Sequence, residues 1–178
     1  FYKELAKKKK KKHNPPPHKN KKKIIYSPLH GAGSPIVENS LEYWGFSNVQ
    51  VVPEQKDPDG DFPTVAFPNP EEKEALSLGT KLMLDSNSDL FFATDPDADR
   101  VGVVISRKGE AIALTGNQIA CICLEHICSH LKKDEDSTPL AFVKTIVTSE
   151  LFKDIVESWG HKNFDVLTGF KYIAQKIE

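Results

Sequence analysis

The chain has 178 residues, 39% of them hydrophobic and 28% charged, and its formal net charge is −1. This length and composition allow one domain or one and a fraction, with enough apolar residues for a core. No apolar run approaches the roughly 18 residues of a membrane span, and the N-terminus lacks the apolar stretch of a signal peptide. The cysteines Cys121, Cys123 and Cys128 are odd in number and lie within one predicted helix, so we expect no disulfide framework and a cytoplasmic location.

Residues 1–23 form a lysine-rich segment. They hold 11 of the 24 basic residues but only one of the 25 acidic ones, so the remainder of the chain is acidic. A segment of this composition cannot bury apolar surface, and we expect a disordered or extended tail. Such a tail can bind nucleic acid through phosphate contacts. Its only aromatic residues, Phe1 and Tyr2, lie at the extreme end, so a solvated tail is the stronger interpretation and nucleic-acid binding the weaker one.

Strand and helix signals alternate beyond the tail. Ser34 is expected to cap a helix with Pro35 at its first position, and Gly45 to end it. Asn69 and Pro70 are expected to begin the next helix. The expected strands cover residues 24–27, 49–53, 89–93, 101–105, 111–114, 142–147 and 164–167, and the expected helices cover residues 34–45, 70–85 and 118–131, with two more that end near Gly160 and begin near Phe170.

This alternation predicts an α/β fold in which a mixed sheet has helices on both faces. Residues 54–69 form a long loop rich in proline and aspartate, and loops of this length are usually functional or mobile. We expect one α/β domain at residues 24–137, and a partial α/β domain at residues 138–178 after a polar linker.

The run Asp95-Pro96-Asp97-Ala98-Asp99, followed by Arg100, is the strongest candidate for a functional site. It follows the apolar residues 90–93, where a strand ends, and ligands of α/β sheets collect at such ends. Carboxylate oxygens suit Mg²⁺, and arginine can hold a phosphate with two parallel hydrogen bonds. A calcium loop of the EF-hand kind needs Gly and Glu where this chain has Arg100 and Ser106. The motif indicates a metal-assisted phosphate site, with a solvated acidic turn as the alternative.

This motif resembles the metal-binding loop of the α-D-phosphohexomutases, and other stretches resemble that family in the same order. Residues 24–33 look like the first strand and loop of the family's second domain, and residues 62–72 look like the stretch before its metal loop. Residues 53–59 are similar to the branch that handles phosphoglucose, phosphopentose or glucose bisphosphate. Residues 143–148 and 167–172 look like the opening of the third domain, so the resemblance covers about residues 24–178.

The resemblance implies the second domain and the start of the third domain of a mutase. Such an enzyme isomerises a sugar phosphate through a bisphosphorylated intermediate, with a phosphoserine on the enzyme. Carried over, Asp95, Asp97 and Asp99 would hold Mg²⁺, and Arg100 would be a catalytic residue that faces the phosphoserine. The family's Ser-His-Asn-Pro segment of the first domain and its Arg-x-Ser-Gly-Thr loop of the fourth do not occur here, so the chain resembles a central fragment that is inactive by itself.

Two further sets of residues are candidates for the site. Thr168 and Gly169 with Lys171 are candidate contacts to a substrate phosphate, because lysine binds phosphate as a point charge. A turn with a surface lysine is the alternative for them. His30 is a weaker candidate, because the strand before it should run parallel to the strand before Asp95, which would bring it near the same cleft.

Three functions remain open from the sequence. The first is the central part of a phosphosugar mutase whose substrate is a phosphorylated sugar and whose first and fourth domains lie elsewhere in the same polypeptide. The second is a noncatalytic module that binds a metal or a phosphosugar. The third is nucleic-acid binding through the basic tail. The ordered motif matches favour the first, and we expect no membrane partner.

Overall fold

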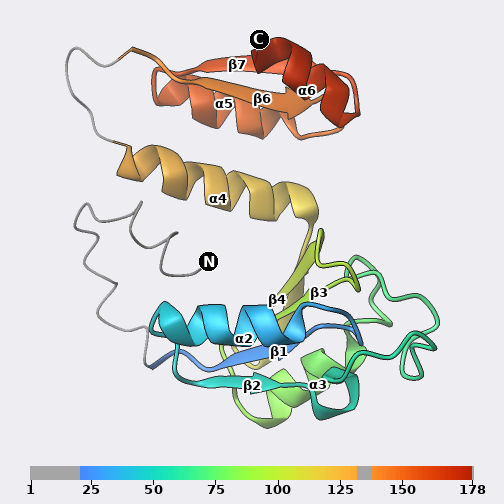
Figure 1. The fold of residues 1–178 in the computed structure, drawn as a ribbon. Helices are drawn as coiled ribbons and strands as arrows, with labels where there is room; N and C mark the ends of the chain where they lie inside the picture. Colours follow the sequence, from blue (N-terminus) through green and yellow to red (C-terminus); the bar gives the residue numbers. More distant parts are fainter. Residues whose placement is uncertain (1–20, 132–137, 178) are drawn as a thin grey trace. The chain divides into compact units, whose positions relative to one another are not determined.

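The computed structural model describes residues 21–131 and 138–177 (Figure 1). The chain divides into two compact units, residues 1–115 and residues 116–178, and each is described by itself. The prediction of a disordered tail concerns residues that lie almost entirely outside the described ranges. Within the described ranges, every helix is too short or too polar to cross a bilayer.

Unit 1 is built on a five-stranded mixed sheet, as the alternation of strands and helices predicts. Its strands are β1 (Ile24–Ser27), β2 (Val49–Val51), β3 (Leu90–Thr94), β4 (Val101–Arg107) and β5 (Glu110–Leu114), in the spatial order β2-β1-β3-β4-β5. Strand β1 runs parallel to β2 and β3, whereas β4 runs antiparallel to β3 and to β5. The parallel strands β1 and β3 therefore end at the same edge of the sheet.

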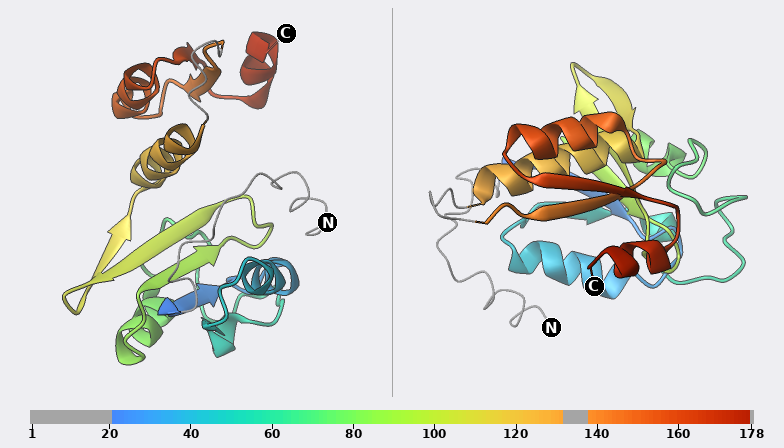
Figure 2. Two further views of the ribbon diagram at one scale, coloured as in Figure 1. Left: turned by 90° about the vertical axis from the view of Figure 1, so that its left-hand side faces the viewer. Right: turned by 90° about the horizontal axis from the view of Figure 1, so that it is seen from above.

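Two helices cover the sheet of unit 1. Helix α2 (Ser34–Tyr43) and helix α3 (Ser77–Asp85) lie on opposite faces (Figure 2). Successive strand residues point to opposite faces: the ring of Phe91 packs on Gly79 of α3, whereas Phe92 stacks against Tyr26 with a centroid distance of 5.0 Å. Full burial of a side chain like Phe91 contributes about 1.5–3 kcal/mol. The core on the α3 side consists of Ile25, Leu29, Val52, Val65, Ala75, Leu76, Met83, Phe91, Ala93 and Val104.

Both helix starts in unit 1 differ from the expected ones. Ser34 is the first residue of α2 rather than its cap, and its hydroxyl donates to Glu38 Oε1 at 2.9 Å. Helix α3 begins at Ser77, whereas we expected a helix from Pro70. Pro70 is buried and lies against Gly102 of β4, and the segment between it and Ser77 forms turns instead of a helix.

The described residues of unit 2 form two parallel strands and three helices. Strands β6 (Ala141–Thr145) and β7 (Lys162–Val166) pair with each other, and helices α5 (Glu150–Ser158) and α6 (Phe170–Ile177) lie on opposite faces of this pair (Figure 2). Helix α4 (Gly116–His130) completes the unit. Ser149 caps α5, because its side chain accepts a hydrogen bond from the backbone N–H of Leu151 at 3.3 Å.

Helix α4 belongs to unit 2, whereas we expected it at the end of the first domain. Its residues Leu124 and Cys128 form a buried cluster with Val156 of α5. In addition, Asn117 near its start accepts a hydrogen bond from the backbone N–H of Ser149 at 2.8 Å. The division between the units thus falls after residue 115 rather than at residues 137–138, because the apolar face of α4 packs on α5.

Candidate metal centre

The acidic loop follows β3 directly, at the edge of the sheet where β1 also ends. The turn is closed by a hydrogen bond from the backbone N–H of Ala98 to the carbonyl oxygen of Asp95 at 3.0 Å. Ala98 has a left-handed backbone with φ of 60°, which is uncommon for a residue with a side chain and occurs mostly in turns and functional sites. This turn bends the chain so that alternate side chains gather on one side of the loop.

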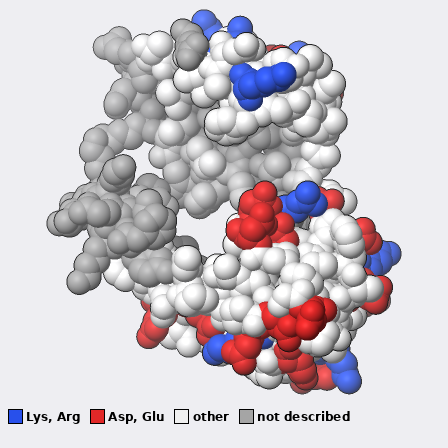
Figure 3. All heavy atoms as spheres, turned by 45° about the vertical axis from the view of Figure 1, so that its right-hand side comes forward, with Lys and Arg blue, Asp and Glu red and all other residues white. Residues whose placement is uncertain are grey.

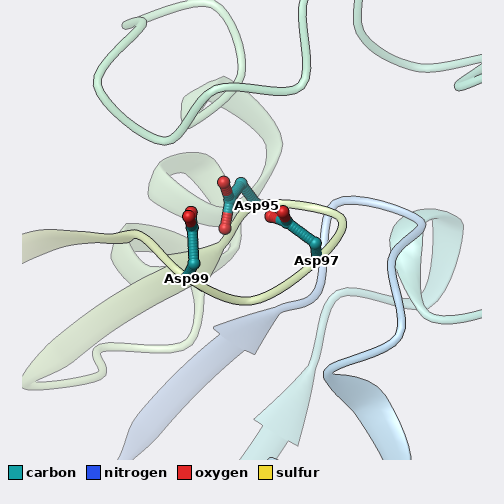
Figure 4. Close-up of side chains that lie close together, drawn as sticks. All are labelled: Asp95, Asp97 and Asp99. Carbon is teal, nitrogen blue, oxygen red and sulfur yellow. The ribbon is translucent and has the colours of Figure 1, made fainter. Parts of the chain in front are cut away.

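Three carboxylates converge in this loop (Figure 4). Asp95, Asp97 and Asp99 each offer an oxygen, and these oxygens all lie within 4.8 Å of one another. Asp95 is 8% exposed, whereas Asp97 and Asp99 are open to solvent. Among the residues that the structure describes, no other His, Cys, Asp and Glu side chains gather in this way.

The three carboxylates repel one another when they are ionised and no cation is bound. The pKa of Asp99 is raised above its ordinary value, chiefly by a hydrogen bond with the Asp95 carboxyl and then by the charge of Asp97, and Arg100 opposes this shift. On the face of unit 1 drawn in Figure 3, acidic side chains also gather in patches. A bound cation would remove this repulsion, because opposite charge favours the ionised carboxylate.

Arg100 begins the chain segment that leaves the loop. Its backbone N–H donates to Asp95 Oδ1 at 2.9 Å, and its Nε lies 3.9 Å from an oxygen of Asp95 and 3.9 Å from an oxygen of Asp99. The two side-chain contacts are long for ion pairs, and 55% of the Arg100 side chain is exposed. The guanidinium is therefore held near the carboxylates but is still accessible to an anion.

The donor set fits a hard divalent cation. It consists of carboxylate oxygens alone, and Mg²⁺ binds through one or two carboxylates, water and phosphate oxygens rather than through a complete protein cage. The exposed positions of Asp97 and Asp99 leave one side of the cluster open for such additional ligands. The same residues do not suit Zn²⁺ of the structural kind, which prefers sulfur and nitrogen ligands.

The loop after β1 lies directly against the acidic loop. The backbone N–H of Ala32 donates to the carbonyl oxygen of Pro96 at 2.9 Å, and a β-carbon at Gly31 would overlap Pro96. His30, which is 5% exposed, thus lies one residue from the contact with the acidic loop. Its side chain is bonded to Thr64 at 2.9 Å, and a role for His30 in the site is still a prediction.

The second set of candidates lies in unit 2, in the loop between β7 and α6. Gly169 has a φ of 135°, a conformation that favours glycine, and its carbonyl oxygen accepts a hydrogen bond from the backbone N–H of Tyr172 at 3.0 Å. Lys171 Nζ lies 4.8 Å from the centre of the Tyr172 ring. The assignment of Thr168, Gly169 and Lys171 to substrate binding is still a prediction.

Sequence reasoning missed three polar residues that the structure makes prominent. Gln55 is fully buried and bonds to Thr64, and Lys144 is buried at the end of β6. A lysine inside the apolar pattern of a strand is a signal that could have identified Lys144. No comparable signal marks Gln55 or Thr64, because both lie in a loop without a periodic pattern of apolar residues.

A separate groove of about 730 Å³ lies between α3 and the strands β4 and β5. Leu76, Leu84 and Ile112 provide apolar walls, and Lys73 and Lys81 lie at its border. None of the three converging aspartates lines it, so the groove is not part of the candidate metal centre.

Two family models match almost the whole chain. The model described as phosphoglucomutase/phosphomannomutase, alpha/beta/alpha domain II matches residues 1–109, and the model of domain III of the same family matches residues 115–178. The limit between the two matches agrees with the division of the chain into two units.

Curated relatives and a solved structure resemble the chain. A phosphoglucomutase of Staphylococcus saprophyticus is 41% identical over 158 residues, which are 88% of this chain and 28% of the relative. A phosphoribomutase of Saccharomyces cerevisiae is 40% identical over an alignment of 162 residues, and the match covers 85% of this chain and 26% of the relative. The structure of Aspergillus fumigatus N-acetylphosphoglucosamine mutase in complex with GlcNAc-6P and magnesium has a TM-score of 0.58 at 13% identity, over 87% of this chain and 32% of that one. The chain thus spans between a quarter and a third of the length of these proteins.

Proposed function

Because the chain belongs to the phosphoglucomutase/phosphomannomutase family, we propose that it is the central part of a mutase that moves phosphate between positions of a sugar. The observation that carries this proposal is the convergence of three aspartates beside an accessible arginine. Phosphoryl transfer depends on positioning and charge neutralisation more than on covalent chemistry by side chains. The arrangement of this loop suits that demand.

Asp95, Asp97 and Asp99 are the proposed ligands of Mg²⁺. When bound, the ion would neutralise charge on the transferring phosphoryl group and orient it. The magnesium in the Aspergillus fumigatus mutase complex supports this choice of metal. Asp95 is the most buried of the three and accepts a hydrogen bond from the backbone of Arg100, so it would anchor the set, and the exposed Asp97 and Asp99 would complete it.

Arg100 is the proposed catalytic cation. Its guanidinium would hold a phosphoryl group next to the metal through paired hydrogen bonds, which a lysine could not provide. The contacts of its Nε with Asp95 and Asp99 restrict where the side chain points. In the same proposal, Thr168, Gly169 and Lys171 of unit 2 contact the phosphate of the sugar substrate.

The substrate is a phosphorylated sugar of the glucose or pentose kind, as the names of the relatives suggest. Because the chain spans only 28% of the first relative, the first and fourth domains of the whole polypeptide would provide the catalytic serine and further substrate contacts. A cytoplasmic location is part of the proposal, and it accords with the free state of Cys121, Cys123 and Cys128.

Metal binding by the chain itself tests the site. Mn²⁺ has the same preference for carboxylate ligands as Mg²⁺ and can be followed by its paramagnetism. We expect the chain to bind Mn²⁺, Mg²⁺ to displace it, and Asp97→Asn to weaken binding by at least about tenfold. Asp57→Asn, a matched change at an exposed aspartate outside the loop, should leave the affinity unchanged.

Equal affinities of the Asp97→Asn chain and the unchanged chain would refute the metal site. A noncatalytic binding module predicts the same metal binding, so only a measurement of turnover distinguishes it from a mutase. In the complete polypeptide, a mutase requires that Asp97→Asn abolish most of the turnover, whereas a binding module has no turnover to lose.

A further inference from the structure

Four polar side chains of unit 1 form a continuous chain of hydrogen bonds. The hydroxyl of Ser27 bonds to Gln55 Oε1 at 2.7 Å, Gln55 Nε2 bonds to Thr64 Oγ1 at 3.0 Å, and Thr64 Oγ1 bonds to His30 Nε2 at 2.9 Å. Ser27 and Gln55 are fully buried, and His30 is 5% exposed. We call Ser27, Gln55, Thr64 and His30 the polar relay.

One direction of hydrogen bonding along the relay gives each donor in it an acceptor. Ser27 Oγ already accepts a hydrogen bond from the backbone N–H of Leu29 at 3.0 Å, so its own proton needs an acceptor, and Gln55 Oε1 is that acceptor. The Gln55 amide nitrogen then donates to Thr64, whose hydroxyl proton is left for His30 Nε2. In this arrangement Nε2 of the neutral His30 ring accepts, and the ring proton lies on Nδ1.

The same segment also holds the backbone of His30. Its N–H donates to the carbonyl oxygen of Gln55 at 3.0 Å, and its carbonyl oxygen accepts from the N–H of Asp59 at 3.0 Å. Leu29 and His30 both have left-handed backbones, with φ of 48° and 62°. Such residues persist only where the surroundings hold them. Residues 55–64 provide that restraint through the relay and these two backbone bonds.

The two residues after His30 contact the acidic loop and connect His30 to it. Gly31 lies in contact with Pro96, and the backbone N–H of Ala32 donates to the Pro96 carbonyl oxygen. Pro96 is the residue between Asp95 and Asp97. A rotation of the His30 backbone would therefore move the surface on which Pro96 rests.

We propose that the polar relay braces the acidic loop, and that His30, with its proton on Nδ1, is a positioning residue that keeps Asp95 and Asp97 converged for metal binding. The inference rests on the proposed metal site for its functional meaning. The proposal assigns a role to the long loop of residues 54–69. This loop restrains the turn after β1 through hydrogen bonds, and that turn contacts and supports the acidic loop.

A pair of substitutions at Thr64 tests the brace. Thr64 is half-buried, and Thr64→Val keeps the shape of the side chain while it removes the hydroxyl that joins Gln55 to His30. Thr64→Ser keeps the hydroxyl and removes only a methyl group. Far-UV circular dichroism and thermal unfolding establish that both variants are folded.

Three measurements that do not involve activity follow the effect of these substitutions. Nitrogen-15 NMR of the His30 ring, at a pH well above the ordinary titration range of histidine, should show Nε2 without a proton in the unchanged chain and in Thr64→Ser. Thr64→Val should lose this preference. Mn²⁺ affinity should fall by about tenfold in Thr64→Val, as for other residues that orient metal ligands, and the backbone amide signals of residues 95–100 should shift.

The outcomes separate this inference from the proposed function. Protonated Nε2 in the unchanged chain overturns the proposed position of the His30 proton and the direction of the relay, whether or not any variant folds. Unchanged Mn²⁺ affinity in Thr64→Val, together with unshifted amide signals at residues 95–100, overturns the brace. If the unchanged chain bound no Mn²⁺, the metal site would fail, while the amide signals would still decide whether the relay holds the loop.

Discussion

Gly31 lies so close to the backbone of Pro96 that a side chain has no room between them. Neither partner is a flexible side-chain end that could move aside, so an added methyl group must displace one of the two loops. We predict that Gly31→Ala destabilises unit 1 by about 1–3 kcal/mol, the usual cost of overpacking, and lowers Mn²⁺ affinity by about tenfold. Urea unfolding and Mn²⁺ titration measure the two effects.

The control for this change is Gly60→Ala. Gly60 has nothing within 4 Å of an added β-carbon, so its replacement should leave stability within about 0.5 kcal/mol and the metal affinity unchanged. If Gly31→Ala behaved like Gly60→Ala, the two loops would not be coupled through Pro96.

Lys144 joins three elements of unit 2. Its side chain is 1% exposed, and its Nζ donates to Glu150 Oε1 of α5 at 2.9 Å, lies 3.3 Å from Asp165 Oδ1 of β7, and bonds to the carbonyl oxygen of Thr148 at 3.2 Å. The bond to Glu150, and then that to Asp165, raises the pKa of Lys144 against the opposing effect of burial. The ammonium group is therefore charged at neutral pH and acts as a tie between β6, α5 and β7.

We predict that Lys144→Met lowers the urea midpoint of unit 2 at neutral pH. The variant leaves the Thr148 carbonyl oxygen without its side-chain donor and removes the cation between two carboxylates. Lys153→Met is the matched control, because Lys153 is 43% exposed and its ion pair with Glu157 spans 4.0 Å. An exposed pair of this kind contributes no more than about 0.5 kcal/mol. Equal midpoints for the two variants would contradict the role of Lys144.

Stability of the same elements should depend on pH in a defined direction. The hydrogen bond from Asn163 lowers the pKa of Asp165 most, with help from Lys144 and against the effect of burial. A carboxyl with a lowered pKa stabilises the fold above its ordinary value of 3.8, and this contribution is lost as the pH falls through the folded-state value. The raised pKa of Lys144 contributes below 10.5 and is lost at higher pH. In Lys144→Met the loss of stability on the acid side should be smaller, though still present because Asn163 stays in place.

At the scale of the whole molecule, the chain has a proposed metal-binding loop in unit 1 and a proposed phosphate-binding loop in unit 2. The sequence contains no Ser-His-Asn-Pro segment, which the resemblance implies for the catalytic serine. We predict that the purified 178-residue chain binds Mn²⁺ but has no mutase turnover on glucose 1-phosphate in a coupled assay. Turnover by this chain that disappears with Asp97→Asn would contradict the need for further domains.

The sequence by itself determined the order of strands and helices and the position of Asp95, Asp97 and Asp99 in one turn after a strand. Both follow from local rules. Apolar runs separated by turn residues mark strands and helices in chain order, and alternate residues that follow a strand at a turn can gather on one side. The mixed sheet with helices on both faces was predictable for the same reason.

Only the tertiary structure decided that α4 packs with α5, that α3 begins at Ser77, and that His30 is held by Thr64 and Gln55. Each of these depends on contacts between residues far apart in the chain, such as His30 and Thr64, which are 34 residues apart. Local propensity describes what a segment can form by itself. The partner that buries an apolar face or satisfies a polar side chain depends on how the segments pack in space. The local sequence pattern does not contain this information.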